Sequence, residues 1–414
     1  MKILSILSQK PSSTGSGVYM GELVKSFDKI GAKQAIICGQ DLNQPNDYEF
    51  ARHIEDLKVY SVDFNSEALP FDMFGMSDVM PYPSQRYQDM TPDQLKKYKE
   101  AFVAVMKTAM EEFRPDLIIS HHLYLATSFF IETFGSKNLG AICHGTDLRQ
   151  LNSNGKNREE IIGRIREAEK VFVLQEDQKN DVSRLFNIEK ERIKIIGNSF
   201  NSEIFHIKDI QKDKERLKDK VELVYAGKIA KSKGLLSLIR AINQIDNYQI
   251  RLKLAGGIGD LEEYEEIKIL AQSSPHEIEF SGQMDQHQLA DLFNRSDLFV
   301  LPSYYEGLAL VCVEAAACGL PVVATNTSGI KDHVSGKLNK DHFIFVDLPA
   351  MHQVDEPVEE SLPEFESALA EAIREHIRVL EEGNFHREYL KKELFSWDYV
   401  ARSILEEFTL GKGC

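Results

Sequence analysis

The sequence predicts an α/β protein of two domains, each built on a parallel β-sheet. Short apolar runs rich in β-branched residues alternate with amphipathic helical runs, which is the pattern of strands joined by helical crossovers. A length of 414 residues also exceeds what one hydrophobic core usually holds. A charged, weakly apolar stretch at residues 206–220 interrupts the alternation near the middle of the chain. We therefore expect one α/β domain on each side of that stretch.

The first half begins with a strand followed by a helix and then continues the same alternation. Strands are expected at residues 2–7, 34–39, 115–121, 139–145 and 170–175. An amphipathic helix is expected at 18–31, closed by Gly31, and a longer helix at 92–113. Residues 40–92 are expected to form an irregular insert.

The second half repeats the alternation after the charged stretch. Strands are expected at 221–227, 248–256, 278–282, 297–303 and 321–325, and helices at 237–245, 287–296 and 313–319. The last amphipathic run is "FSWDYVARSILEEFTL", which holds the only tryptophan, Trp397. A terminal helix this apolar is expected to pack on another part of the protein.

Composition and charge exclude several classes of protein. Hydrophobic residues make up 43% of the chain and charged residues 28%, as in ordinary globular proteins. The net charge is −16, of which residues 1–200 contribute −3 and the rest −13, and this argues against nucleic acid as the main partner. No apolar run approaches the ~20 residues of a membrane span, and the run at residues 3–7 is too short for a signal peptide. We therefore expect a cytoplasmic protein.

The five cysteines do not indicate a disulfide framework or a zinc site. Their number is odd, and no two of them form a C-x-x-C pair. Four of the five lie among apolar or small residues, so we expect reduced, structural thiols.

A glycine-containing loop follows the first strand, with the sequence "SSTGSGVYMG". Gly15 and Gly17 let the backbone approach a ligand closely, and a helix beginning there presents unpaired N–H groups to an anion. A dinucleotide-binding turn is an alternative, since Asp41 lies at a suitable distance. The glycines are spaced G-x-G-x-x-x-G, however, which is one residue longer than that motif.

The run "AICHGTDLR" places a histidine at the end of another strand. His144, Gly145 and Asp147 directly follow apolar residues. A histidine in such a position can be an ordinary core residue. The neighbouring glycine and the strand end favour a site residue, because open α/β sheets bind ligands at the carboxyl ends of their strands.

Two lysines follow the first strand of the second half, in "VYAGKIAKSKGLLSLIRAI". Lys228 and Lys233 precede a helix that opens at Gly234, and two ammonium groups at a helix N-terminus suit a diphosphate. Lys231 is expected to be an ordinary solvated lysine.

Two acidic residues bracket an otherwise apolar segment, "YYEGLALVCVEAAACGLPVVAT". Gly307 and the residues after it lead into a helix whose N-terminal amides can receive phosphate oxygens. Glu314 lies about two turns into that helix, and a carboxylate there can accept hydrogen bonds from the two vicinal hydroxyls of a ribose. A salt bridge to a neighbouring strand is the alternative for Glu314.

Taken together, these segments resemble the family-4 retaining glycosyltransferases (glycosyl transferases group 1), which have the GT-B fold. The most specific part is the E-x7-E element, "EGLALVCVE", followed by "AAACGLPVVATNTSG". The runs "GKIAKSKGLLSLIRAI" and "EFSGQMDQHQLADLF" match the flanking family motifs, and "TGSGVYMGELVKSF" and "CHGTDL" match the N-terminal ones.

The resemblance implies two Rossmann-like domains that face each other across a cleft. Residues 1–200 would bind the acceptor, residues 201–395 the nucleotide-sugar, and residues 396–414 would form a helix packing on the N-terminal domain. The activity implied is hexosyl transfer with retention of configuration, from a nucleoside-diphosphate sugar, UDP-sugar favoured, to a hydroxyl acceptor.

The resemblance also implies roles for individual residues. His144 and Glu306 would be the catalytic residues against the transferred sugar, and Glu314 would hold the donor ribose. The donor diphosphate would be bound by Gly15, Gly17, Lys228, Lys233, Leu308, Ala309 and Leu310. Gln283 and Met284 would lie near the base, and Asp147, Gly307 and Asn198 near the acceptor or sugar.

Two positions depart from the family pattern. Lys228 stands where the family usually has arginine, so it keeps the charge and loses the bidentate fork. Ala309 stands where glycine is common, which leaves the donor sugar and base open. No Asp-x-Asp tripeptide occurs in the chain, which favours a site without a metal or other cofactor.

Several alternatives remain at the level of sequence. A sugar-nucleotide 2-epimerase shares the two-domain layout, and a catalytically inactive partner subunit would keep it too. A nicotinamide oxidoreductase is disfavoured by the glycine spacing. The acceptor could be a small polar molecule, a glycan or a lipid-linked glycan. The helix at 92–113 carries four lysines beside apolar positions, but its acids dilute the basic face, so peripheral membrane contact is not favoured.

Overall fold

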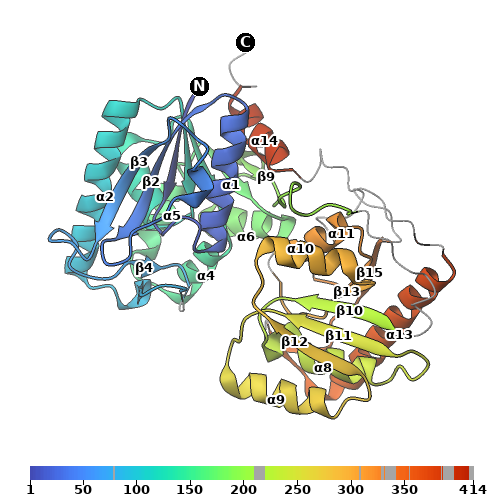
Figure 1. Ribbon diagram of the computed structural model, residues 1–414. Helices are drawn as coiled ribbons and strands as arrows, with labels where there is room; N and C mark the ends of the chain where they lie inside the picture. The colour runs from blue at the N-terminus through green and yellow to red at the C-terminus, as the bar shows by residue number, and fades with distance from the viewer. Residues whose placement is uncertain are drawn as a thin grey trace. The chain divides into compact units, whose positions relative to one another are not determined.

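The computed structural model describes residues 1–77, 80–208, 220–306, 309–327, 331, 342–353, 355–383, 385 and 396–409. The chain divides into two compact units (Figure 1). One unit comprises Met1–Gly197 with Trp397–Cys414, and the other comprises Asn198–Ser396. The sequence predicted boundaries at residues 200 and 395. Each unit is a parallel α/β sheet with helices on both faces, as expected for the fold class.

The N-terminal unit has a seven-stranded parallel sheet. In spatial order its strands are β3 (Lys58–Phe64), β2 (Lys33–Asp41), β1 (Lys2–Leu7), β6 (Leu117–His121), β7 (Leu139–Ile142), β8 (Lys170–Val173) and β9 (Ile193–Ile195). The chain order reverses at β1, which pairs with β2 on one side and β6 on the other. Open α/β sheets bind ligands beyond the carboxyl ends of their strands at such a point. A ligand-binding site of this unit is therefore expected at the carboxyl ends of β1, β6 and β7.

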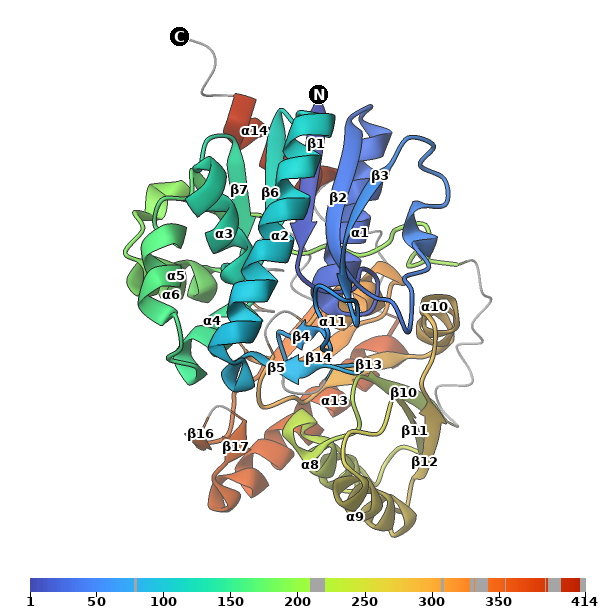
Figure 2. The same ribbon diagram turned by 90° about the vertical axis from the view of Figure 1, so that its left-hand side faces the viewer.

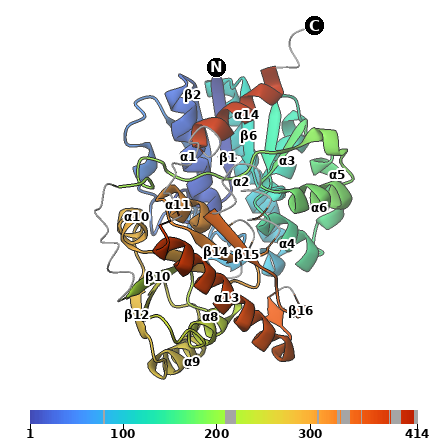
Figure 3. The same cartoon turned by 90° about the vertical axis from the view of Figure 1, so that its right-hand side faces the viewer.

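Helices cover both faces of this sheet. They are α1 (Gly15–Lys29), α2 (Pro92–Phe113), α3 (Leu125–Phe134), α4 (Thr146–Ser153), α5 (Arg158–Ile165), α6 (Glu176–Phe186) and α14 (Trp397–Thr409). Figure 2 shows α2 and α3 in front of the sheet, and Figure 3, from the other side, shows α1 and α14. Helix α2 begins where the sequence predicted, because Thr91, the residue before Pro92, forms a capping box with Gln94 in the first turn.

Among the residues that the structure describes, no helix combines the length and the apolar character needed to cross a membrane.

The insert at residues 40–92 is more regular than the sequence predicted. It contains β3, which pairs with β2 at the edge of the sheet, and a small pair of strands, β4 (Phe74–Gly75) and β5 (Gln85–Arg86). Strand β3 was missed because its sequence, "KVYSVDF", alternates apolar and polar residues in the manner of an exposed edge and lacks a long apolar run.

The C-terminal unit has a six-stranded parallel sheet. In spatial order its strands are β12 (Glu277–Gly282), β11 (Ile250–Ala255), β10 (Val221–Ala226), β13 (Leu298–Leu301), β14 (Val322–Thr325) and β15 (Phe343–Val346). A two-stranded antiparallel pair, β16 (Met351–Gln353) and β17 (Glu356–Pro357), lies outside this sheet. Its helices are α8 (Leu235–Ile242), α9 (Leu261–Gln272), α10 (Gln286–Arg295), α11 (Leu310–Ala317) and α13 (Leu362–Glu381). The charged stretch at 206–220 lies largely outside the described residues.

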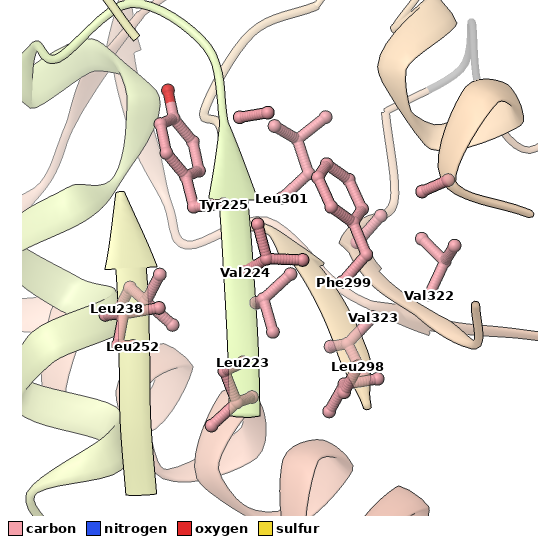
Figure 4. Close-up of a cluster of buried hydrophobic side chains, with 14 of the residues drawn as sticks. Leu223, Val224, Tyr225, Leu238, Leu252, Leu298, Phe299, Leu301, Val322 and Val323 are labelled. Atoms are coloured by element: carbon pink, nitrogen blue, oxygen red, sulfur yellow. The ribbon is translucent and has the colours of Figure 1, made fainter. Parts of the chain in front are cut away.

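The core of this unit is formed by the central strands and the helices on both faces. Leu223 on β10 lies in register with Leu252 on β11 and Leu298 on β13, and all three are fully buried (Figure 4). Strands that are buried on both faces are expected to be continuously apolar, and these three strands were therefore predicted from their apolar runs.

The C-terminal helix belongs to the N-terminal unit. Trp397 is buried, and its ring meets that of Tyr19 edge to face, with the centroids 4.7 Å apart. Glu407 accepts from Lys170 at 2.9 Å and from Lys194 at 3.2 Å. Helix α14 thus lies against α1 and also ties to strands β8 and β9 (Figure 3).

Candidate functional site

In the loop between β1 and α1, backbone packing requires glycine at position 17 but not at position 15. Thr14 is the N-cap of α1 and accepts the N–H of Gly17 at 3.1 Å. A Cβ on Gly17 would lie 2.9 Å from the carbonyl oxygen of Lys10 and 2.8 Å from the amide nitrogen of Ser12, so this loop needs glycine there. A Cβ on Gly15 would meet nothing within 4 Å. The predicted role of both glycines at a diphosphate stays a prediction.

His144 lies beside a second histidine that the sequence analysis did not select. His121 is the last residue of β6 and pairs in the sheet with Ile142, the last residue of β7. His144 follows two residues later, and its Nε2 lies 3.0 Å from Nδ1 of His121. The ring of Tyr19 meets the ring of His144 at 83° with the centroids 5.2 Å apart, and the ring of His122 lies 4.8 Å away.

The three histidines are neutral at neutral pH. Burial lowers the pKa of His121 and of His144 well below the usual value, and the neighbouring histidines lower both further. Burial likewise lowers the pKa of His122 to about 3. His144, which is half-buried, therefore acts as a neutral hydrogen-bonding group and not as a cation.

Asp147 holds the loop that carries His144. Its carboxylate accepts the N–H of Leu123 at 2.8 Å and that of His144 at 3.3 Å, and it accepts from Sγ of Cys143 at 3.3 Å. The side chain is fully buried, and burial raises its pKa although these donors oppose the change. Asp147 thus links the segments that follow β6 and β7, and its predicted place near the acceptor or sugar stays a prediction.

In the C-terminal unit, Lys228 follows β10 in a crowded turn. The hydroxyl of Tyr225 donates to the carbonyl of Lys228 at 2.8 Å. A Cβ on Gly256 would lie 1.7 Å from the carbonyl oxygen of Gly227, so the ends of β10 and β11 approach too closely for any side chain there. The Lys228 side chain is exposed.

Lys233 and Glu306 come together at the ends of β10 and β13. Nζ of Lys233 lies 2.8 Å from Oε1 of Glu306, with side-chain exposures of 25% and 16%. The approach depends on Gly234, which has a φ of +66° and opens α8, and whose Cβ would lie 2.1 Å from the carbonyl oxygen of Pro302. Lys231, in contrast, is exposed and pairs with Glu266.

Glu314 is the fifth residue of α11, which begins at Leu310 after the buried Ala309. It is half-buried, and burial raises its pKa to about 7. No residue of the described part of the chain pairs with or hydrogen-bonds to its carboxyl group, so the alternative of a salt bridge to a neighbouring strand is not seen there. Gly307 and Leu308 lie outside the described residues.

The remaining predicted residues lie at strand ends or in local turns. Gln283 is exposed directly after β12, and Met284 is half-buried against the core of the C-terminal unit. The side-chain oxygen of Asn198 accepts the N–H of the next residue, Ser199, at 2.9 Å. The predicted roles of these three residues at the base and the sugar stay predictions.

Tyr19, His121 and His122 were not predicted from the sequence as site residues. The adjacent histidines in "ISHHLY" lie at the end of an expected strand, and the rule that singled out His144 applies to them as well. Tyr19 gave no such signal, since an aromatic residue one turn into an amphipathic helix is usually part of the core.

Comparisons with known proteins find a glycosyltransferase family model over part of the chain and glycosyltransferases among the relatives. Residues 207–346 match the family model described as Glycosyl transferases group 1. An uncharacterized glycosyltransferase of Methanocaldococcus jannaschii is 26% identical over 255 residues, which are 58% of this chain and 60% of that protein. A Bacillus subtilis protein named as a glycosyltransferase of teichuronic acid biosynthesis is 23% identical over 80% of this chain and 82% of its own length.

Solved structures resemble the whole chain. A glycosyltransferase from Rickettsia africae superposes with a TM-score of 0.67 at 15% identity, covering 100% of this chain and 99% of that one. An Anabaena protein crystallised with UDP and glucose gives a TM-score of 0.64 at 16% identity, over 99% of this chain and 100% of that one. At these identities the likeness shows the fold, which is GT-B.

Proposed function

We propose that this chain, whose residues 207–346 form a group 1 glycosyl transferase domain within a GT-B fold, moves a sugar from a nucleoside diphosphate to a hydroxyl group. We further propose that the anomeric configuration is retained and that no metal is needed. The observation that carries the proposal is the meeting of Lys233 with Glu306, 2.8 Å apart at the carboxyl end of the sheet. Glu314 follows on the next helix with no partner among the described residues.

Lys233 supplies positive charge where the leaving group needs it. Departure of a nucleoside diphosphate leaves an oxocarbenium-like sugar, and negative charge grows on the diphosphate. A preorganised cation that meets this charge lowers the barrier by about 2–4 kcal/mol. Lys228 adds a second ammonium group at the end of β10. Together these lysines take the place that a metal ion has in other transferases.

Glu306 changes partner when the donor binds. In the structure its carboxylate neutralises Lys233. The diphosphate competes for the same ammonium group, and Glu306 is then released to accept hydrogen bonds from the transferred sugar. Glu314 accepts from the ribose hydroxyls, and ionisation of its carboxyl group makes both of its oxygens acceptors.

His144 hydrogen-bonds a hydroxyl of the transferred sugar. The low pKa of its ring keeps it neutral, so it can orient a hydroxyl without adding a charge near the oxocarbenium-like centre.

Relatives support more than one donor base. The Anabaena structure contains UDP and glucose, and a starch synthase from Arabidopsis thaliana was crystallised with ADP and acarbose. We favour a UDP-sugar for this chain, with Gln283 and Met284 beside the base.

Thermal stabilisation tests the donor site. UDP, GDP, ADP and NAD are added separately at millimolar concentration, with and without EDTA. A ligand at ~100 times its Kd adds about 2.7 kcal/mol of stability. We expect one nucleoside diphosphate to stabilise the protein equally with and without EDTA, and Glu314→Ala to abolish the effect. Stabilisation by NAD alone would overturn the proposal, and loss of the effect with EDTA would overturn metal independence.

Product analysis separates the transferase from its alternatives. With the donor identified, a transferase releases nucleoside diphosphate only in proportion to the glycosylated acceptor, and NMR of the product gives the anomeric configuration. Conversion of the nucleotide-sugar without an acceptor would indicate an epimerase. Donor binding without turnover on small polar, glycan or lipid-linked acceptors would indicate an inactive partner subunit.

A further inference from the structure

The His121–His144 pair has the geometry of a defined hydrogen bond between two imidazoles. The planes of the rings are 18° apart, their centroids are 5.2 Å apart, and the two facing nitrogens are 3.0 Å apart. Nearly parallel rings whose nitrogens meet at hydrogen-bond distance lie edge to edge, in almost one plane. One of the two nitrogens must therefore carry the proton and the other must accept it.

The surrounding structure holds the pair in place. The N–H of His122 donates to the carbonyl of Ile142 at 2.9 Å, which continues the sheet beyond His121. The hydroxyl of Thr127 donates to the carbonyl of His122 and lies 2.7 Å from that of Ser120. His122 itself has a φ of +72°, which is uncommon for a residue other than glycine, and these contacts stabilise it. The neighbouring ring of Tyr19 meets both histidine rings edge to face.

The unused nitrogens of the two rings have different surroundings. Nε2 of His121 is buried and has no hydrogen-bond partner. Nδ1 of His144 has no partner among the described residues either, but His144 is half-buried and Nδ1 is not among the buried, unsatisfied atoms. Nδ1 of His144 is thus the nitrogen of the pair that remains available to a ligand.

Two proton arrangements are conceivable for the neutral pair. If His144 donates through Nε2, the proton of His121 is on its Nε2, where a buried N–H would have no acceptor. If His121 donates through Nδ1, its Nε2 is a bare ring nitrogen and only an acceptor is left unpaired. Orphaned buried N–H groups are rarer in proteins than under-used acceptors, so the second arrangement is favoured.

We propose that His121 is a positioning residue whose Nδ1–H donates to Nε2 of His144, fixing His144 as the tautomer that presents Nδ1–H to the ligand. His144 is then a hydrogen-bond donor at the site and cannot accept a proton from the acceptor hydroxyl through that nitrogen. The identity of the ligand as a sugar rests on the proposed function, whereas the tautomer of His144 does not.

Imidazole NMR of the wild-type protein tests the tautomer directly. The chain has 12 histidines, so the signals of His144 are assigned by their loss in His144→Gln. Long-range ¹H–¹⁵N correlations distinguish a ring protonated at Nδ1 from one protonated at Nε2. We expect the Nδ1–H form for His144 near pH 7.5. The Nε2–H form would overturn the proposal, whether or not the protein transfers a sugar.

A matched pair of substitutions tests the role of His121. In His121→Asn the amide nitrogen can take the place of Nδ1 and donate to His144. In His121→Asp the side chain has the same shape as asparagine, but its carboxylate only accepts and therefore favours a proton on Nε2 of His144. We expect the Nδ1–H form to persist with Asn and to disappear with Asp, and kcat with Asp to be lower by about 100-fold. His53→Asn is the control, because His53 is an exposed histidine outside this cluster.

The outcomes separate a positioning role from a merely structural one. If Asn and Asp reduce kcat equally while the tautomer of His144 stays the same in both, His121 only fills space and the proposal is wrong. If the Asp variant does not fold, the wild-type spectrum together with that of His121→Asn still decides the matter. Failure of all sugar transfer would count against the proposed function and leave the tautomer measurement valid.

Discussion

Glu314 is a half-buried carboxyl group without a partner among the described residues. Its carboxyl group lies on a helix with fully buried neighbours such as Cys312 and Ala315. Nothing among the described residues neutralises it, and burial raises its pKa to about 7. A polar group left in this way is typical of a site that a ligand completes.

The raised pKa predicts how stability depends on pH. The folded protein holds a proton on Glu314 up to about pH 7, whereas the unfolded chain releases it near pH 4.5. The resulting stabilisation is full below pH 4.5 and is lost as the pH rises through 7. We expect wild type to lose about 1–2 kcal/mol relative to Glu314→Gln between pH 5 and 8, allowing for partial exposure. Each kcal/mol of lost stability lowers Tm by roughly 2–4 °C. Parallel Tm curves of the two proteins over this range would contradict the prediction.

Lys233 and Lys231 differ in partner and burial although two residues separate them. Lys233 is half-buried against Glu306, and Lys231 is exposed against Glu266. We expect Lys233→Met to reduce kcat/KM by about 30- to 1,000-fold, as loss of one preorganised electrostatic contact does. Lys231→Met is the control and should change kcat/KM less than about twofold, because exposed ion pairs contribute little. Equal effects of the two substitutions would argue against a diphosphate at Lys233.

At the level of elements, the turn between β10 and α8 depends on close backbone packing. The segment Lys231–Lys233 is a single 3-10 turn, and Gly234 reverses the chain into α8 with its φ of +66°. The amide of Tyr304 donates to the carbonyl of Ser232 at 3.2 Å, which links this turn to the chain leading to Glu306. Ser237 at the start of α8 lies 3.0 Å from the hydroxyl of Tyr304 and donates to Glu366 on α13. The position of Lys233 relative to Glu306 is therefore set by backbone contacts and buried hydrogen bonds.

Two glycines with a similar φ test this account. Gly234→Ala places a Cβ 2.1 Å from the carbonyl oxygen of Pro302, and Gly282→Ala, at a φ of +72°, meets nothing within 4 Å. We expect Gly282→Ala to cost about 1–2 kcal/mol, the strain of the left-handed conformation alone. Gly234→Ala should cost about 3 kcal/mol or more, since the backbone must move as well. Urea denaturation measures both, and equal losses would show that the approach to Pro302 is unimportant.

At the level of the whole molecule, helix α14 belongs to the same unit as the N-terminal half of the chain. Helix α14 returns to the N-terminal unit, and Trp397 packs on Tyr19, which in turn contacts the ring of His144. The C-terminal segment thereby supports a candidate site residue that lies more than 250 positions earlier in the chain.

Removal of the Trp397 side chain should weaken both the fold and the site. We expect Trp397→Ala to destabilise the N-terminal unit by about 3–5 kcal/mol, as other buried aromatic truncations do. Arg402→Ala, at an exposed position of the same helix, should stay within about 0.5 kcal/mol of wild type. Differential scanning calorimetry measures the loss, and turnover below the unfolding temperature shows whether Tyr19 and His144 are disturbed. A Trp397→Ala protein as stable as Arg402→Ala would mean that α14 contributes little.

The sequence by itself determined the α/β class, most strands and helices, and the segments that match the group 1 glycosyl transferases. It could do so because these features are local: buried parallel strands are continuous apolar runs, and the motifs are short stretches of chain. The same locality explains the misses, since the edge strand β3 has no apolar run and the strand end at His121 and His122 carries no motif.

Only the tertiary structure decided which side chains meet. The contacts of Lys233 with Glu306, of His121 with His144 and of Trp397 with Tyr19 join residues 73, 23 and 378 positions apart. Such pairs depend on the order and register of strands within a sheet and on the packing of helices against it. No local pattern specifies them, because they exist only once distant segments have been brought together by burial of a common core.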